Sequence, residues 1–296
     1  MLCILYVNAI GLLLGIAGLL VERALPGTFS RRWVWCAVIA ISITIPPVYQ
    51  ARHTASVAAA IGNESLSTTI HTVWFTGSAL IVVWGIFNIL YISRLVSRAR
   101  RKRHGAPAVI DDVPVLITDS IGPATVGLWR SRVLIPRWVL ALPRDQRQYV
   151  VRHEEEHRRA KDSRLLFGMS LLLILVPWNV ALWWQLRRLY LAVEVDCDNR
   201  VVSALGDAPA YGELLFKVAQ AGNHGPRLPR LQPAFLGGAG MLERRLNMLL
   251  APTQLRAAQR WLLPIAACVI LFVVLSLPHP VPSGNTPDHS TMESTH

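Results

Sequence analysis

The sequence predicts a mainly α-helical integral membrane protein with four transmembrane helices and a mixed α and β domain on the cytoplasmic side. The composition is apolar, because 52% of the 296 residues are hydrophobic and only 16% are charged. A soluble globular domain carries about 25% charged residues. Four apolar runs also reach the length of about 17–25 residues that a helix needs to cross a bilayer. They are residues 2–21, 33–49, 72–92 and 261–277.

The basic residues predict the orientation of these runs. Arg23, Arg31 and Arg32 lie between the first two runs, whereas Arg52 is the only Lys or Arg in the loop of residues 50–71. Because cytoplasmic loops are rich in Lys and Arg, we expect the N-terminus to lie outside and the region after the third run to lie in the cytoplasm. The basic residues that follow the third run are Arg94, Arg98, Arg100, Arg101, Lys102 and Arg103.

The predicted domains follow from the same runs. We expect three transmembrane helices with short loops in residues 1–93, a cytoplasmic domain in residues 94–260 and a fourth transmembrane helix in residues 261–277. Residues 278–296 are rich in Pro, Ser, Thr and His and are too few to bury a core, so we expect a disordered extracytoplasmic tail. The first run has no basic residue ahead of it, so we expect it to be retained rather than cleaved as a signal peptide.

Residues 153–157 read HExxH, and they carry most of the predicted chemistry. On a helix His153 and His157 lie one turn apart on one face, where both imidazoles can bind one zinc ion while Glu154 faces the metal-bound water. We expect this helix to begin near Pro143 and to end at about Lys161. The alternative is a solvated surface helix that is rich in Arg and Glu.

A second predicted helix supplies a third ligand. Glu194 can bind the metal, and Asp198, four residues later, can accept the ring N–H of a ligand histidine. Two His, one Glu and an open position for water form the catalytic class of zinc site. Asp162 either supports this site or forms a surface salt bridge with Arg158 or Arg159. Glu155 and Glu156 are interpreted as solvated or structural, and Cys197 as a small core residue.

The apolar stretch of residues 165–184 bears directly on this site. If it crossed the membrane, Glu194 would lie on the opposite side from the histidines and no zinc site could form. Pro177 and Asn179 near its middle instead predict two half-length helices, re-entrant or packed against the membrane spans, that return the chain to the cytoplasmic face. Residues 113–118 and 132–135 are predicted strands of a small sheet, whose edge could pair with an extended substrate.

Three segments resemble the BlaR/MecR family of membrane-embedded zinc metallopeptidases. They are residues 122–136, which include Pro-x-x-x-Gly-Leu, then HExxH followed by Arg159 and Asp162, and finally Glu194 with Cys197 and Asp198. The resemblance implies a gluzincin-like domain in a bacterial-type cytoplasmic membrane. Family sensors of beta-lactams continue into a large extracellular penicillin-binding domain, whereas only residues 278–296 follow the last run here. We therefore expect no such sensor domain and no direct acylation by beta-lactams.

The resemblance also implies a function, which is regulated proteolysis in signal transduction. Zinc would activate a water, and Glu154 would take its proton and deliver it to the leaving amine. The expected partners are the lipid bilayer and a protein substrate, either a cytoplasmic transcriptional repressor or another regulator. Self-cleavage in residues 222–240 and a homodimer are left open. The basic run beside the third span favours anionic lipid over direct contact with nucleic acid. Tyr190 and His224 are the candidates for stabilising the oxyanion.

Two other functions remain open at the level of sequence. Glu154, Glu155 and Arg159 also spell EExxxR, as in intramembrane proteases of the prenyl-protein type, but the companion motifs of those enzymes are missing. A non-catalytic membrane receptor that keeps the same fold is the second alternative. A complete ligand set argues against the receptor, because a receptor has no chemical need for it.

Overall fold

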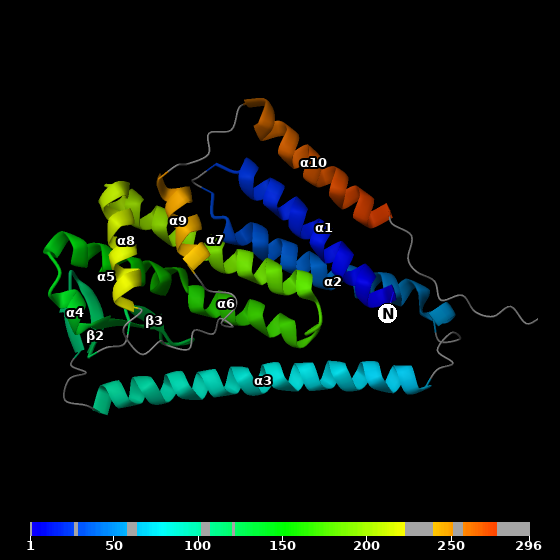
Figure 1. The fold of residues 1–296 in the computed structure, drawn as a ribbon, viewed down its shortest axis with the longest axis horizontal. Helices are drawn as coiled ribbons and strands as arrows, with labels where there is room; N and C mark the ends of the chain where they lie inside the picture. Colours follow the sequence, from blue (N-terminus) through cyan, green and yellow to red (C-terminus); the bar gives the residue numbers. More distant parts are fainter. Residues whose placement is uncertain are drawn as a thin grey trace, which may run out of the picture.

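The computed structural model describes residues 2–26, 29–57, 64–101, 107–119, 122–222, 239–250 and 257–276. Within these residues the protein is mainly helical. Helices α1 (Leu2–Ala24), α2 (Arg32–Val57) and α10 (Ala257–Ser276) lie together at one end, a compact unit with a small sheet lies at the other, and α3 (Glu64–Arg101) runs along both (Figure 1). We refer to these four helices as the long helices. The predicted tail, His224 and nearly all of the proposed self-cleavage loop lie outside the described residues.

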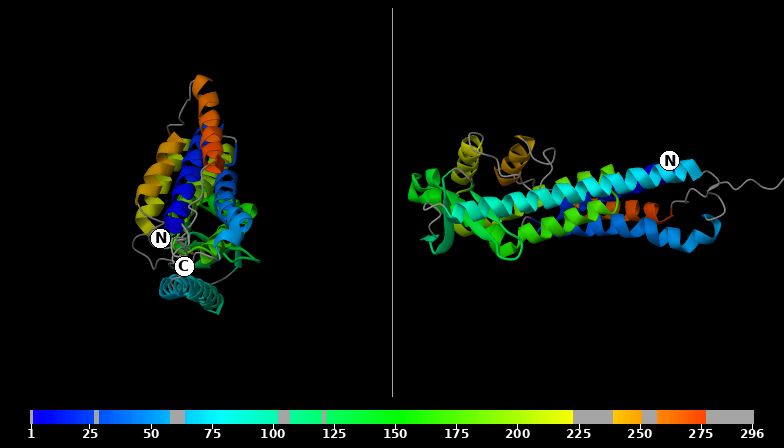
Figure 2. Two further views of the ribbon diagram at one scale, coloured as in Figure 1. Left: turned by 90° about the vertical axis from the view of Figure 1, so that its right-hand side faces the viewer. Right: turned by 90° about the horizontal axis from the view of Figure 1, so that it is seen from below.

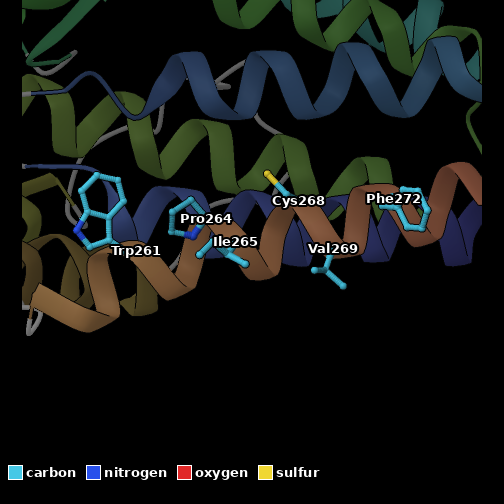
Figure 3. A pocket seen from close by; sticks show the side chains of 6 residues that line it. All are labelled: Trp261, Pro264, Ile265, Cys268, Val269 and Phe272. Atoms are coloured by element: carbon cyan, nitrogen blue, oxygen red, sulfur yellow. The ribbon is translucent and has the colours of Figure 1, made fainter.

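Two of the long helices are long and apolar enough to cross a membrane, namely α1 through Leu5–Ala24 and α3 through Thr72–Tyr91. The apolar stretches of α2 and α10, Arg32–Thr44 and Trp261–Ser276, are shorter. The count of four spans therefore stays a prediction. On α10, an open apolar groove is lined by Trp261, Pro264, Ile265, Cys268, Val269 and Phe272 (Figure 3). These side chains include no carboxylate or histidine that could take part in hydrolysis. Their apolar character fits a surface that faces lipid.

Helix α1 packs closely against α7 (Val180–Leu205). A Cβ atom added at Gly15 would overlap the Trp184 ring, and one added at Gly11 would come within 2.8 Å of the Ala181 Cβ. Small residues at this spacing allow two helix backbones to approach, as they do in membrane helix pairs. Substitution at either glycine would push α1 away from α7.

The apolar stretch of residues 165–184 forms a hairpin. Helix α6 (Asp162–Leu171) continues into a short 3-10 turn, the chain reverses near Pro177, and α7 returns to the compact unit (Figure 1). The start of α7 is capped, because the Asn179 side chain accepts from the Leu182 amide at 3.0 Å. The Asn8 side chain of α1 accepts from the Val180 amide at 2.9 Å. Glu194 therefore lies at the same end of the molecule as the HExxH helix.

Helix α3 runs apart from the other long helices and touches the hairpin at its turn (Figure 2). The Trp74 indole donates to the Leu175 carbonyl at 2.8 Å, and the Ser78 hydroxyl donates to the Ile174 carbonyl at 2.7 Å. These two bonds satisfy carbonyl groups that the end of the 3-10 turn leaves without helical partners. The turn is thus held from one side by α1 and from the other by α3.

The sheet has the strand order β1-β2-β4-β3. The strands are β1 (Pro107–Ile110), β2 (Val113–Thr118), β3 (Ala124–Val126) and β4 (Arg132–Pro136). Strands β2 and β4 pair in parallel and form the centre, and the other two pairings are antiparallel. The strands predicted at residues 113–118 and 132–135 are confirmed as this central pair. The two edge strands, β1 and β3, are not among the predicted strands.

Helix α5 (Arg144–Ala160) packs against the sheet through Val150 and Val151, which join Val133 and Ile135 in one core. Pro143 precedes the first turn, and Lys161 at φ 56° ends the helix in the left-handed region. The predicted helix from Pro143 to about Lys161 is therefore confirmed. Helices α4 (Arg137–Leu140), α8 (Ala208–Gly222) and α9 (Ala239–Leu250) complete the unit.

Candidate metal centre

Helices α5 and α7 bring the three predicted ligands together. The Nε2 atoms of His153 and His157 are 3.2 Å apart, as expected for residues one turn apart on one helix face. The Glu194 carboxylate faces both rings, with one oxygen 3.8 Å from Nε2 of His153 and the other 3.9 Å from Nε2 of His157. All three side chains thus converge on one point from two helices.

This geometry fits a zinc ion. Zinc binds imidazole nitrogens at about 2.0–2.1 Å in tetrahedral geometry, so two ligand nitrogens lie about 3.3–3.4 Å apart. The observed 3.2 Å between the two Nε2 atoms is close to that separation. A donor set of two His and one Glu also suits zinc and leaves one position for water.

Cys197 of α7 also lies at this centre, because His153, His157 and Cys197 place possible ligand atoms within 4.8 Å of one another. Its sulfur is 3.4 Å from Nδ1 of His153, which lies on the far side of the ring from Nε2. Burial raises the pKa of the Cys197 thiol. Cys197 is therefore best described as packing behind the His153 ring, in line with its interpretation as a core residue.

His157 is oriented by Asp162. Its Nδ1 atom is 2.8 Å from a carboxylate oxygen of Asp162, so the ring donates from Nδ1 and leaves Nε2 free for a metal. Asp162 is only 2% exposed, and its other oxygen accepts from Arg32 at 2.6 Å. The alternative of a surface salt bridge from Asp162 to Arg158 or Arg159 was wrong, because the carboxylate is turned inward.

His153 is oriented by a different pair of residues. Its Nδ1 atom is 2.8 Å from the Tyr211 hydroxyl of α8 and 3.5 Å from an oxygen of Asp198. The Tyr211 hydroxyl donates to Asp198 at 2.8 Å, so it accepts the N–H of His153. Burial and the nearby Asp198 charge raise the pKa of Tyr211 well above its usual range, which keeps the phenol protonated.

Arg245 of α9 lies beside the third predicted ligand. It donates to both oxygens of Asp198 at 2.7 and 2.8 Å and lies 2.9 Å from Glu194. Burial would lower its pKa, but the Asp198 and Glu194 charges raise that pKa well above its usual range. A fixed positive charge therefore orients the carboxylates of both residues. Neither Arg245 nor Tyr211 belongs to a sequence motif from which its role could have been predicted.

The pKa values of the two histidines are shifted in opposite directions. Burial, followed by the neighbouring His157, lowers the pKa of His153 to about 3 and makes this ring neutral near pH 7. Burial also lowers the pKa of His157, but its contacts with Cys197 and Asp162 outweigh burial and raise that pKa well above its usual range.

Glu154 lies next to the edge strand β3. Glu154 is 7% exposed. The Thr125 hydroxyl donates to the main-chain carbonyl oxygen of Glu154 at 2.6 Å and lies 3.1 Å from the Glu154 carboxylate. Thr125 therefore fixes the position of this glutamate relative to β3.

The other two glutamates of the motif are structural. Glu155 is buried and pairs with Arg158 and Arg159 at 2.6 and 2.8 Å. Glu156 is also buried, and it pairs with Arg152 at 2.8 Å and Arg200 at 3.0 Å. The solvated interpretation of these two residues was therefore wrong. The first candidate for the oxyanion, Tyr190, lies in the hydrophobic core with the long helices.

Comparison with known proteins places this geometry in a family. Residues 28–249, more than half of the chain, match the family described as BlaR1 peptidase M56. The chain belongs to this family. It is also similar to the regulatory protein BlaR1 of Bacillus licheniformis, with 27% identity over 97 residues. That alignment covers 32% of this chain and 16% of the Bacillus protein, so the chain matches well under two thirds of that relative's length.

Membership of the M56 family agrees with the centre described above. The family is zinc-dependent, and its members are membrane-associated signalling peptidases of the BlaR1 type. In this M56 chain the residues suited to hold zinc are His153, His157 and Glu194, and the side chains that orient them are Asp162, Tyr211, Asp198 and Arg245. The resemblance seen in residues 122–198 is thus confirmed over a longer part of the chain.

Proposed function

We propose that this M56 peptidase is a membrane-embedded zinc metalloendopeptidase that performs regulated proteolysis in signal transduction. Its substrate would be a cytoplasmic transcriptional repressor, another regulator or the chain itself. The observation that carries the proposal is the convergence of His153, His157 and Glu194, with Glu154 beside them. This constellation has the parts that hydrolysis of a peptide bond requires.

The mechanism assigns one task to each side chain. His153 and His157 would hold zinc through Nε2, with a carboxylate oxygen of Glu194 as third ligand; when bound, zinc activates a water and polarises the scissile carbonyl. Glu154 takes the proton of that water and delivers it to the leaving amine. Arg245 and Tyr211 hold Glu194 and His153 in place, so that little reorganisation is needed during the reaction.

The substrate would bind as an extended segment along β3. This strand is at the edge of the sheet, and its Thr125 contacts Glu154. An extended chain can add to such an edge by main-chain hydrogen bonds, which recognise the backbone more than the side chains. This fits an endopeptidase that cuts within an exposed loop of a folded regulator.

The positions of basic residues at the helix ends support a cytoplasmic location for the compact unit. Arg23, Arg31 and Arg32 sit at the ends of α1 and α2 next to the compact unit, and Arg101 ends α3 at the same side (Figure 1). By the positive-inside rule this end faces the cytoplasm. We therefore propose a topology of four spans. Residues 1–93 form three spans with short loops, residues 94–260 form the peptidase domain, residues 261–277 form the fourth span, and residues 278–296 lie outside.

The test combines metal content with cleavage. Detergent-purified wild type is compared with Glu154→Gln and Glu194→Ala, and with Glu213→Gln as a control at a glutamate whose side chain is 71% exposed. We expect about one zinc per chain in wild type, Glu154→Gln and the control, and none in Glu194→Ala. Fragments of the chain itself, or of unfolded casein, should come only from wild type and the control.

The other outcomes point elsewhere. Zinc retained by Glu194→Ala would remove Glu194 from the ligand set. Cleavage that is undiminished in Glu154→Gln would remove Glu154 from its role as base. Zinc in wild type without any cleavage, including cleavage of candidate repressors, would favour the non-catalytic receptor.

A further inference from the structure

The first turn of α2 is fastened to the helix that carries Glu194. Asp196 of α7 accepts from the Ser30 hydroxyl at 2.6 Å, and from the main-chain amides of Arg31 and Arg32 at 3.0 and 3.1 Å. Asp196 is 4% exposed, so these bonds are protected from water. A carboxylate here also complements the positive end of the α2 dipole. The start of α2 therefore has a fixed position relative to α7.

From this position, the Arg32 side chain reaches the metal centre. Its Nη1 atom is 2.6 Å from one oxygen of Asp162, whose other oxygen is 2.8 Å from Nδ1 of His157. The Nε atom of Arg32 donates to the Ser30 hydroxyl at 3.0 Å, which fixes the direction of the guanidinium. A continuous chain of contacts thus leads from α2 through Arg32 and Asp162 to a predicted zinc ligand.

Asp162 has a second cationic neighbour that competes for its orientation. Nη2 of Arg200 is 3.7 Å from the same Asp162 oxygen that binds His157. Because Asp162 is buried, it needs a close positive partner. Arg32, at 2.6 Å, is much closer to Asp162 than Arg200 is, so it provides the nearest positive charge to this carboxylate.

We propose that Arg32 is a positioning residue through which the location of α2, relative to α7, sets the orientation of His157 and the affinity of the site for zinc. This inference rests on the proposed function, since it takes His157 as a ligand. It assigns a means of regulation to the site, because α2 is predicted to cross the membrane. A shift of α2 by a few tenths of an ångström would lengthen the contact from Arg32 to Asp162.

The experiment measures zinc binding rather than cleavage. All proteins carry Glu154→Gln to prevent self-cleavage, and the added variants are Arg32→Gln, Arg32→Lys, Asp196→Asn and Arg31→Gln. The last is a matched control, because the Arg31 side chain contacts Met248 at 3.4 Å and not Asp162. Zinc affinity is measured by competition with a chromogenic chelator. The visible absorption of the Co²⁺-loaded proteins reports ligand geometry.

We expect Arg32→Gln to lower zinc affinity about 10-fold and to change the Co²⁺ spectrum, since loss of such outer partners costs about 10–100-fold. Arg32→Lys should recover most of the affinity, because an ammonium still gives Asp162 a close cation. Asp196→Asn should lower affinity by a smaller factor through the position of α2, and Arg31→Gln should match the parent. A merely structural role would lower stability without changing the Co²⁺ spectrum.

Contrary results separate the two proposals. If the Glu154→Gln parent binds no zinc, the proposed function fails, and the positioning role of Arg32 that rests on it fails too. If the parent binds zinc, and Arg32→Gln or Asp196→Asn has the affinity and spectrum of the parent, the positioning role is overturned. A loss in Arg31→Gln as large as that in Arg32→Gln would also overturn it, because the effect would then not pass through Asp162.

Discussion

The two histidines of the centre are held by different parts of the molecule. His153 is oriented by Tyr211 and Asp198, which belong to α8 and α7 of the compact unit. His157 is oriented by Asp162, whose cationic partner Arg32 starts the long helix α2. One ligand is therefore fixed within the compact unit, and the other depends on how that unit meets the long helices. The metal geometry thus reports the relative position of the two parts.

The largest effect is expected on the His153 side. Asp198→Ala removes the carboxylate that binds Arg245 and Tyr211, and it leaves a buried guanidinium without its main partner. Breaking such a pair costs about 3–5 kcal/mol. We expect the free energy of unfolding, measured by urea titration in detergent, to fall by that amount, with loss of zinc binding.

A matched control uses a pair on the surface. The side chains of Asp119 and Arg137 are 52% and 53% exposed, and their contact is 3.1 Å. Asp119→Ala should therefore cost less than about 1 kcal/mol. A loss of the same size in both variants would show that the centre contributes no more to folding than a surface ion pair does.

A finer test of the same side removes only a hydroxyl. Tyr211→Phe keeps the ring packing but breaks the link between His153 and Asp198, so zinc affinity should fall about 10-fold in a chelator competition. Because these partners all lie in the compact unit, the loss should be equal in detergent and in lipid nanodiscs. Tyr149→Phe is the control, since its hydroxyl binds the Gly206 carbonyl.

The result in nanodiscs sharpens the contrast between the two ligands. A Tyr211→Phe loss that changes severalfold between detergent and lipid would show that the His153 side also depends on the membrane part. The contrast between His153, oriented within the compact unit, and His157, oriented through α2, would then be wrong.

The smallest expected effect concerns Glu154, which orients neither His153 nor His157. Thr125→Val removes the hydroxyl 3.1 Å from its carboxylate, and one such hydrogen bond contributes about 1 kcal/mol. We expect zinc binding to be retained and the cleavage rate to fall about fivefold. Steady-state cleavage of a fluorogenic peptide would measure it, and an unchanged rate would remove Thr125 from the support of the base.

The sequence predicted those features that depend on local pattern. Helix α5 was found from Pro143 and the spacing of the HExxH residues, and β2 and β4 from their runs of Val, Leu and Ile. Strand β3 has only three residues, too few to show an alternating pattern, and β1 includes Pro107, which weakens the signal of a strand. The edge strand beside Glu154 could therefore not be identified.

The contacts that support the histidines could not be predicted for a different reason. Arg32 and Asp162 are 130 residues apart, and Arg245 and Asp198 are 47 residues apart. Nothing in the sequence around an arginine reveals a partner at such distances. In the sequence Arg32 serves only as a marker of orientation. Glu155 and Glu156 are interpreted there as solvated or structural, and only the structure gives their arginine partners.

The capped start of α7 has a consequence for the biosynthesis of the protein. Asn8, near the N-terminus of α1, accepts from the first amide of the helix that later presents Glu194. A helix start that lacks such a partner in hydrocarbon costs several kcal/mol. In the proposed topology, the start of α7 therefore depends on α1 for a hydrogen bond that hydrocarbon does not supply. The ordering of the helix that carries Glu194 is thereby coupled to the presence of α1 in the bilayer.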